Sequence, residues 1–259
     1  MNKQPFNEKK STSNHTTDKK NKKKSFGFKK FFLALLTLFI VVFLGVGCGL
    51  VAIGLDGDKD VSDIHPPASS QILDMNGNLI TNIHATENRT LVTLDKIPAN
   101  LQNAFIAVED NRFYEHNGID PRGIFRAIYS NLTSGEVAEG GSTITQQLAK
   151  NAFLSQDRTF KRKIQEFFIA LRLERQYTKE EILEMYLNQI YFGRGAYGVQ
   201  AAAQTYFGKD VSQLDLSECA MLAGIPRSPN YYSPLNNLGA ANERKAEVLD
   251  QMVKYGYID

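Results

Sequence analysis

The feature that most constrains this chain is a run of 25 uncharged residues, Phe31 to Leu55, near the start of its 259 residues. As a helix this run would be roughly 37 Å long, enough to cross the roughly 30 Å hydrocarbon core of a bilayer. Five lysines stand before it between positions 22 and 30, and four aspartates follow it between positions 56 and 63. By the positive-inside rule the pattern predicts a single-pass anchor in the cytoplasmic membrane. Residues 1–30 would be cytoplasmic, and everything after Leu55 extracellular or periplasmic.

Two other interpretations of this run fit less well. A cleaved signal peptide would have a shorter apolar core and a cleavage site of small residues. A lipoprotein cleaved before Cys48 would need a large aliphatic residue three positions earlier, where this chain has Gly45. Because Cys219 is the second of only two cysteines, neither a zinc site nor a disulfide is expected.

The positive charge of the chain is confined to its tail. Residues 1–30 hold ten lysines against Glu8 and Asp18, a net charge of +8, so the total of +2 leaves −6 for the other residues. Because the tail also lacks apolar periodicity, it is expected to be disordered. The rest of the chain has no long basic run, so nucleic-acid binding is not expected.

The exported part divides into a linker with short β-strands, residues 56–94, and a mainly α domain, residues 95–259. Asn76-Gly77 between two apolar pairs predicts a hairpin, and the run Thr90 to Leu94 favours extended structure. Helical starts are indicated at Pro121, at Thr143, at the capping box Thr178-x-x-Glu181 and at Asp215. The strongest helical pattern is an apolar stripe that runs from Phe160 to Leu171.

The first candidate for chemistry is the pair Glu109 and Asp110, which directly follows an apolar helical run. Burial disfavours the charged form of a carboxyl group, so a partly buried one could exchange protons near neutrality. The alternative is a solvated helix end followed by a turn at Asn117-Gly118.

A second candidate is the segment from Gly140 to Lys150. Two glycines before Ser142 and Thr143 at a helix start would leave backbone N–H groups free to bind an anion such as a phosphate. Gln146 and Lys150 lie four residues apart on one face, which favours a polar ligand. Thr143 or Ser142 acting only as a helix cap is the plainer interpretation.

The third candidate is Glu166, with Arg162 and Lys163 one turn before it on the same side of the helix. These residues could form a surface ion-pair ladder, or the cations could hold a functional carboxylate ionised. Two carboxylates with an anion site between them in sequence suit the cleavage of a bond between a sugar and a phosphate. One carboxylate would take a proton from the attacking hydroxyl, and the other would help to stabilise the leaving pyrophosphate, directly or through a divalent cation.

These motifs together resemble those of the peptidoglycan glycosyltransferases, glycosyltransferase family 51, over about residues 98–259. The matching segments, in order, are Glu109 to Asp120, Gly140 to Gln147, Arg162 to Glu166, Ile182 to Asn188, and Arg194 to Lys209. The resemblance implies a lysozyme-like α-helical fold with a membrane-facing jaw subdomain. It also implies polymerisation of glycan strands from lipid II, with release of undecaprenyl pyrophosphate from the growing chain.

The resemblance also implies residue roles. Glu109 would be the catalytic acid/base that deprotonates the acceptor 4-hydroxyl, and Glu166 the second carboxylate, near the pyrophosphate. Asp110 and His116 would shape the site around Glu109, whereas Glu184 and Asn188 look structural. A divalent cation, Mg²⁺ or Mn²⁺, is expected near Glu166, and no organic cofactor. The residues implied to line the donor site are Ser142, Gln147, Lys150, Arg158 and Lys163.

Partners implied by the resemblance are lipid II, the nascent glycan chain and the cytoplasmic membrane, together with other cell-wall synthesis and division proteins. An apolar jaw surface would come from Asn151 to Leu154 and from Phe160 onward. Because no Ser-x-x-Lys or Lys-Thr-Gly occurs, no transpeptidase centre is expected in these residues. Relatives normally continue beyond this point, so a truncated class A penicillin-binding protein and a monofunctional enzyme both stay open.

Two competing functions remain. A muramidase or lytic transglycosylase shares the lysozyme-like layout and a catalytic glutamate, but it needs no anion site. A non-catalytic membrane scaffold of the wall-synthesis machinery would have no need for Glu109 and Glu166.

Overall fold

The computed structural model describes two compact units of the chain, Met1–Val51 and Ala52–Asp259. Residues 30–33 and 35–41 of the first unit are helical. Within the described part of the chain, no helix is both long and apolar enough to cross a membrane. The predicted tail up to residue 29 and much of the predicted anchor lie outside the described residues, so both stay predictions. The described residues are 30–33, 35–41, 45, 47, 49, 52, 61, 70–73, 75–76, 79–83, 88–134, 140–155, 157 and 159–259.

The second unit opens with a β-hairpin. Strands β1 (Ser70–Leu73) and β2 (Leu79–Ile83) pair antiparallel, with Ser70 opposite Ile83, and the register shifts between Ile72 and Leu73. This pairing confirms the hairpin predicted around Asn76-Gly77.

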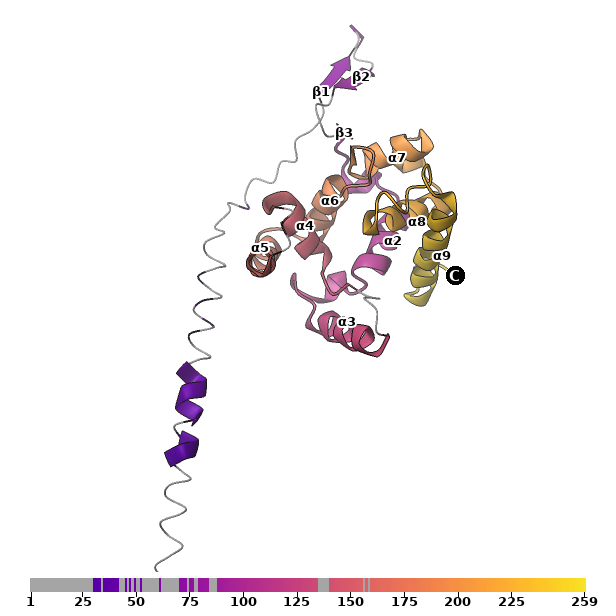
Figure 1. Cartoon of the computed structure of the whole chain (residues 1–259). Coiled ribbons are helices and arrows are strands. Elements are labelled where there is room, and N and C mark those ends of the chain that lie inside the picture. Colours follow the sequence, from indigo (N-terminus) through magenta and orange to yellow (C-terminus); the bar gives the residue numbers. More distant parts are fainter. Residues whose placement is uncertain are drawn as a thin grey trace, which may run out of the picture. The chain divides into compact units, whose positions relative to one another are not determined.

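The rest of the second unit is mainly helical, as predicted. Figure 1 shows α2 between a group formed by α4, α5 and α6 and a pair formed by α8 and α9. The helices are η1 (Leu94–Lys96), α2 (Ala99–Glu109), η2 (Phe113–Glu115), α3 (Pro121–Ser134), α4 (Ile144–Phe153), α5 (Phe160–Gln176), α6 (Lys179–Gln189), α7 (Val199–Phe207), η3 (Val211–Gln213), α8 (Leu216–Gly224), η4 (Ile225–Arg227) and α9 (Leu238–Lys254).

Side-chain caps begin the helices where the sequence predicts them. Thr143 and Thr178 cap α4 and α6, each in a reciprocal box with the residue three positions later. Asp215 caps α8 in the same way. Each box satisfies backbone N–H groups that the first turn of a helix leaves without an intrahelical partner.

Helix α2 joins the two helical groups through its apolar face. Phe105 is fully buried, and its ring packs edge-on against Tyr186 of α6 at 5.9 Å and against Phe192 at 6.1 Å. Leu101 and Ala104 on the same helix are also fully buried. Because α2 contributes to one continuous core, the position of its last residue is set by packing on both sides.

The run Thr90 to Leu94, which the sequence expects to be extended, lies outside any strand: side chains hold its first part, and Leu94 begins η1. The only strand here is β3 (Asn88–Arg89), which pairs in parallel with β4 (Ala196–Tyr197). Asn188 on α6 then accepts from the N–H of Val92 at 3.0 Å and donates to its carbonyl at 2.8 Å. Glu184 accepts from the N–H of Leu94 at 2.7 Å, so Glu184 and Asn188 are structural, as expected.

Helix α5 buries a different face from the one its apolar stripe suggests. The residues buried on it are Glu166, Ile169, Ala170 and Leu173. Phe160 is 79% exposed and Phe167 is 39% exposed, although both belong to the stripe. The stripe therefore predicts the helix correctly but not the direction of the core.

The turn into α7 depends on a glycine without room for a side chain. Gly198 has φ +80°, and a Cβ there would lie 2.8 Å from the carbonyl oxygen of Asn188. Gly208 at the other end of α7 has φ +65° but has no atom within 4 Å of such a Cβ. Gly208 has ψ +24° and is left-handed helical, whereas Gly198 has ψ +158°, a backbone region that essentially only glycine adopts, so both strain and overlap are larger at Gly198.

We predict that Gly208→Ala lowers the free energy of unfolding by about 1 kcal/mol, the cost of a left-handed conformation. Gly198→Ala should cost a further 1–3 kcal/mol, roughly, because its backbone conformation essentially requires glycine and its Cβ overlaps the backbone of Asn188. Urea denaturation of the two variants measures both values. Equal losses would show that the contact with Asn188 relaxes freely.

Candidate active site

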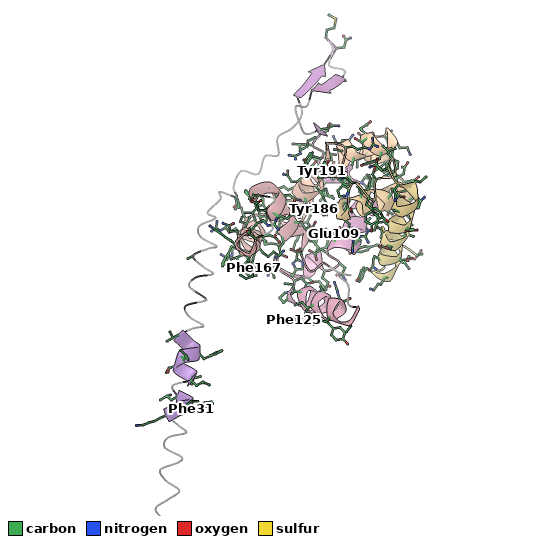
Figure 2. The ribbon with its side chains drawn as sticks, viewed as in Figure 1. Phe31, Glu109, Phe125, Phe167, Tyr186 and Tyr191 are labelled. Atoms are coloured by element: carbon green, nitrogen blue, oxygen red, sulfur yellow. The ribbon has the colours of Figure 1, made fainter. Side chains whose placement is uncertain are left out.

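Glu109 lies at the C-terminal end of α2, at the boundary between two cavities. Its side chain is half-buried, and its Oε2 accepts a hydrogen bond of 2.8 Å from Nε2 of Gln147 on α4. A carboxylate in this position is accessible from both sides while one oxygen is held in place. Figure 2 shows Glu109 near the centre of the helical body.

Asp110 follows directly and links three elements. It ends α2, and its carboxylate lies 2.9 and 3.0 Å from Nε2 of His116. Its Oδ2 also accepts from the N–H of Ile144, the first residue of α4, at 3.0 Å. Asp110 thus joins His116 and the start of α4 to the end of α2, whereas the role in shaping the site that the resemblance implies for Asp110 and His116 stays a prediction.

The start of α4 is occupied by groups of the protein itself. Thr143 caps the helix, and its hydroxyl also donates to the carbonyl of Gly118 at 2.6 Å. Since the N–H of Ile144 binds Asp110, this N–H is not free for a phosphate. The expectation that an anion would bind the backbone N–H groups of this helix start is wrong at Ile144, because the carboxylate of Asp110 already accepts its hydrogen bond.

Side chains of the same segment face the cavities instead. Ser142 lines both of them, and its Oγ accepts a hydrogen bond of 2.8 Å from Nζ of Lys163. Lys163 also forms an ion pair with Glu166, which is 2% exposed. Glu166 is thus connected to the cavity wall through Lys163 and Ser142, while Glu109 lies on that wall.

Lys150 on α4 connects the two carboxylates electrostatically. Its burial lowers the pKa of its ammonium group, while the charge of Glu166 acts in the opposite direction. The nearby cations Arg162 and Lys163 lower this pKa further, and Glu109 raises it. Glu109 and Glu166 therefore both act on one lysine. Arg158, predicted to join this group, lies outside the described residues.

The two cavities have volumes of about 430 Å³ and 850 Å³. Residues common to both include Val108, Glu109, Gly140, Ser142, Arg227 and Arg244. Gln147, Lys150, Gln189 and Tyr191 line the larger cavity, whereas Asn111, Arg126, Tyr232 and Tyr255 line the smaller one. Glu109 therefore borders both cavities, together with Arg227 and Arg244.

This arrangement agrees with the comparison to known proteins. The family model described as Transglycosylase matches residues 76–253, which is more than half of the chain. The chain belongs to the transglycosylase family. It is 47% identical over 234 residues to penicillin-binding protein 1F of Bacillus subtilis (strain 168), covering 89% of this chain and 32% of that protein. It is 48% identical over 234 residues to penicillin-binding protein 1A of Escherichia coli (strain K12), covering 89% of this chain and 27% of that protein.

The chain thus spans a third or less of the length of these two relatives. A crystal structure of penicillin-binding protein 1A from Haemophilus influenzae is 29% identical, with a TM-score of 0.43, and covers 76% of this chain and 19% of that one.

Three side chains that line the two cavities or contact residues lining them were not singled out from the sequence. Arg244 on α9 is 6% exposed, and Gly224 provides space for it, since a Cβ there would lie 2.8 Å from its Cγ. Arg244 lies on the buried face of α9 with Ala241 and Val248. A charged residue on an apolar helix face is the sequence feature that could have identified it. Arg227 has no comparable signal, and Tyr186 looked like an ordinary core residue.

We predict that Asp110→Asn lowers the free energy of unfolding by about 1–3 kcal/mol, because an amide offers one acceptor oxygen and turns a donor toward His116 or Ile144. Urea denaturation measures the loss. Asp250→Asn on the exposed side of α9 is the control and should stay within about 0.5 kcal/mol of the parent. An Asp110 variant as stable as the control would contradict the linking role of Asp110.

Proposed function

We propose that this chain is a peptidoglycan glycosyltransferase of the penicillin-binding-protein type, which polymerises glycan strands in bacterial cell-wall biosynthesis. The observation that carries the proposal is the position of Glu109 between two cavities, with its carboxylate held by Gln147. Family membership and the penicillin-binding relatives support it.

In the proposed reaction Glu109 takes the proton from the 4-hydroxyl of lipid II, the acceptor. The acceptor oxygen forms a bond to the anomeric carbon of the growing glycan. The bond between that carbon and the pyrophosphate oxygen breaks, and undecaprenyl pyrophosphate leaves with the electron pair. Proton transfer by a positioned carboxylate typically contributes 10²–10⁴-fold to a rate, roughly.

We assign the donor to the larger cavity, because Ser142, Gln147 and Lys150 line it. Its cationic side chains suit the charge that develops on a leaving pyrophosphate. Lys163 lies behind Ser142, and Glu166 holds this lysine in place through their ion pair. In this assignment Glu166 acts through Lys163.

The acceptor then occupies the smaller cavity, which Arg126 and Tyr232 line.

A resident divalent cation does not fit the side chains around Glu166. This carboxylate is buried, and its Oε1 binds the ammonium of Lys163, so a cation already occupies the position. Within the described residues, no group of three His, Cys, Asp or Glu side chains could hold a metal ion. The proposed steps therefore use the chain's own lysines and arginines, and the Mg²⁺ or Mn²⁺ that the resemblance implies near Glu166 takes no part in them.

We further propose a lysozyme-like body whose jaw faces the cytoplasmic membrane. The apolar face of α3 supports this, because Phe125, Tyr129 and Leu132 are 73%, 72% and 78% exposed and lie on one side of the helix. Figure 2 shows Phe125 on α3 and Phe167 on α5 at the outer surface of the body. Phe153 and Leu154, which we expected to contribute, are half-buried and pack against the core.

A membrane anchor would complement this face. A substrate on a long lipid is confined to the membrane plane, so an anchored enzyme searches for it locally. The predicted N-terminal anchor, the nascent glycan and cell-wall synthesis or division proteins as partners all belong to this proposal.

A lytic enzyme is the alternative, since it also uses a glutamate. Purified lipid II separates the two, because a transferase makes polymer from it, whereas a lytic enzyme digests finished cell wall and makes none. A scaffold would do neither. The cationic lining of the larger cavity favours transfer from a pyrophosphate.

We predict that Glu109→Gln reduces the rate of lipid II polymerisation by orders of magnitude, because an amide cannot take the proton from the acceptor hydroxyl. Gel analysis of labelled glycan measures the product. Glu243→Gln, on the exposed side of α9, is the matched control and should leave activity unchanged. Full activity of the Glu109 variant would refute the assignment of the base.

A second prediction concerns the α3 face. Replacing Phe125, Tyr129 and Leu132 by serine should weaken binding to phospholipid vesicles by roughly tenfold or more, because each large apolar side chain contributes about 1.5–3 kcal/mol when buried. Co-sedimentation measures the partition. The control variant replaces by serine three other exposed residues, Tyr231, Leu235 and Leu238. Equal losses in the two variants would contradict a specific lipid-facing role for α3.

A further inference from the structure

The hydrogen bond between Gln147 and Glu109 works in only one orientation of the Gln147 amide. The amide has a donor end, Nε2, and an acceptor end, Oε1. Nε2 faces the carboxylate at 2.8 Å. If the amide were turned over, its oxygen would face the carboxylate oxygen, and two acceptors would repel each other. A donor on the other side of the amide, facing Oε1, would reinforce the productive orientation.

The hydroxyl of Tyr186 is in the position to do this. Tyr186 lies on α6, is fully buried, and its hydroxyl donates to Oε1 of Gln147 at 3.3 Å. Packing against Phe105 fixes the ring. Burial raises the pKa of Tyr186 well above its usual value, and the negative charges of Glu109 and Asp110 raise it further. The hydroxyl therefore keeps its proton and remains a donor.

Each group in this series has one consistent role. The hydroxyl of Tyr186 donates to the carbonyl of Gln147, and the NH₂ group of Gln147 donates to Glu109. An ionised carboxylate is a stronger hydrogen-bond acceptor than a protonated one. The hydrogen bond from Gln147 therefore favours the ionised form of Glu109. Only this form can accept a proton from a hydroxyl group.

We propose that Tyr186 is a positioning residue for the transfer reaction. Its hydroxyl orients the Gln147 amide, and the NH₂ group of this amide donates the hydrogen bond that holds the carboxylate of Glu109. The inference rests on the proposed function, and within it adds a determinant of the pH range. Tyr186 acts through Gln147, because it is not among the residues lining the two cavities.

Other charges also face Glu109, and they are the same in every variant considered below. Lys150 on α4 interacts with it electrostatically, and Asp110 is its neighbour in sequence. Charged side chains that line the cavities with it are Asp120, Arg126 and Glu247 in the smaller cavity, Arg89 in the larger one, and Arg227 and Arg244 in both. The proposal therefore concerns a difference between variants, not the absolute position of the pH profile.

The test is the pH dependence of kcat/KM for the full chain in detergent, with lipid II as substrate. In Tyr186→Phe the acid limb of this pH profile should move to higher pH by about half a unit to one unit, comparable to the loss of a hydrogen bond between two uncharged groups. The rates of variant and parent should converge at high pH, where Glu109 is ionised in both. A merely structural role would instead lower the rate by the same factor at every pH and would overturn the proposal.

Gln147→Met removes the amide and should shift the limb in the same direction. The double variant Tyr186→Phe/Gln147→Met should show no further shift, because the tyrosine acts only through the glutamine. Additive shifts would overturn the proposal. If Tyr186→Phe does not fold, an unmoved acid limb in Gln147→Met overturns it instead.

Tyr206→Phe is the matched control. Its hydroxyl donates at 2.7 Å to the carbonyl of Phe192, so the change also removes one tyrosine hydrogen bond but leaves Gln147 untouched. The acid limb of its pH profile should stay in place, and a shift as large as that of Tyr186→Phe would contradict the proposed connection from Tyr186 through Gln147 to Glu109.

If the parent chain makes no polymer, the proposed function fails. If the parent is active, Glu109→Gln is inactive and Tyr186→Phe leaves the limb unmoved, only the positioning role fails.

Discussion

The site depends on one buried carboxylate, Asp110, and the two groups that it binds. Its hydrogen bonds to His116 and to the N–H of Ile144 join the end of α2 to the start of α4. Because α2 is packed into the core through Phe105, Asp110 has little freedom, and α4 must begin where this carboxylate can reach it. The neighbouring residue, Glu109, is then directed to the side chain of Gln147 one turn into α4.

The same interaction explains why, in the proposed function, side chains and not the N–H of Ile144 would bind an anionic ligand. A helix start attracts negative charge, and here that charge is supplied by the protein. Cations for an anionic ligand therefore come from the ends of long side chains such as Lys150, Arg227 and Arg244. They converge from α4, η4 and α9, elements distant in sequence, on one wall that they share with Glu109.

Much of the site could be predicted because its residues interrupt apolar helical patterns. Glu109, Gln147 and Lys150 stood out as polar groups beside apolar runs, and the structure places all of them at one cavity. Pairwise relations could not be predicted in this way. The two-point hydrogen bonding of Asn188 to Val92 spans 96 positions, and nothing local distinguishes it from a β-strand.

By itself the sequence determined the local elements and the family, because capping residues, helical periodicity and ordered motifs act over a few positions. It determined that Thr143, Thr178 and Asp215 begin helices. Only the tertiary structure decided which face of α5 is buried, which carboxylate occupies the start of α4, and that Tyr186 reaches Gln147. These outcomes depend on competition between groups far apart in the chain, and only packing brings such groups within hydrogen-bonding distance.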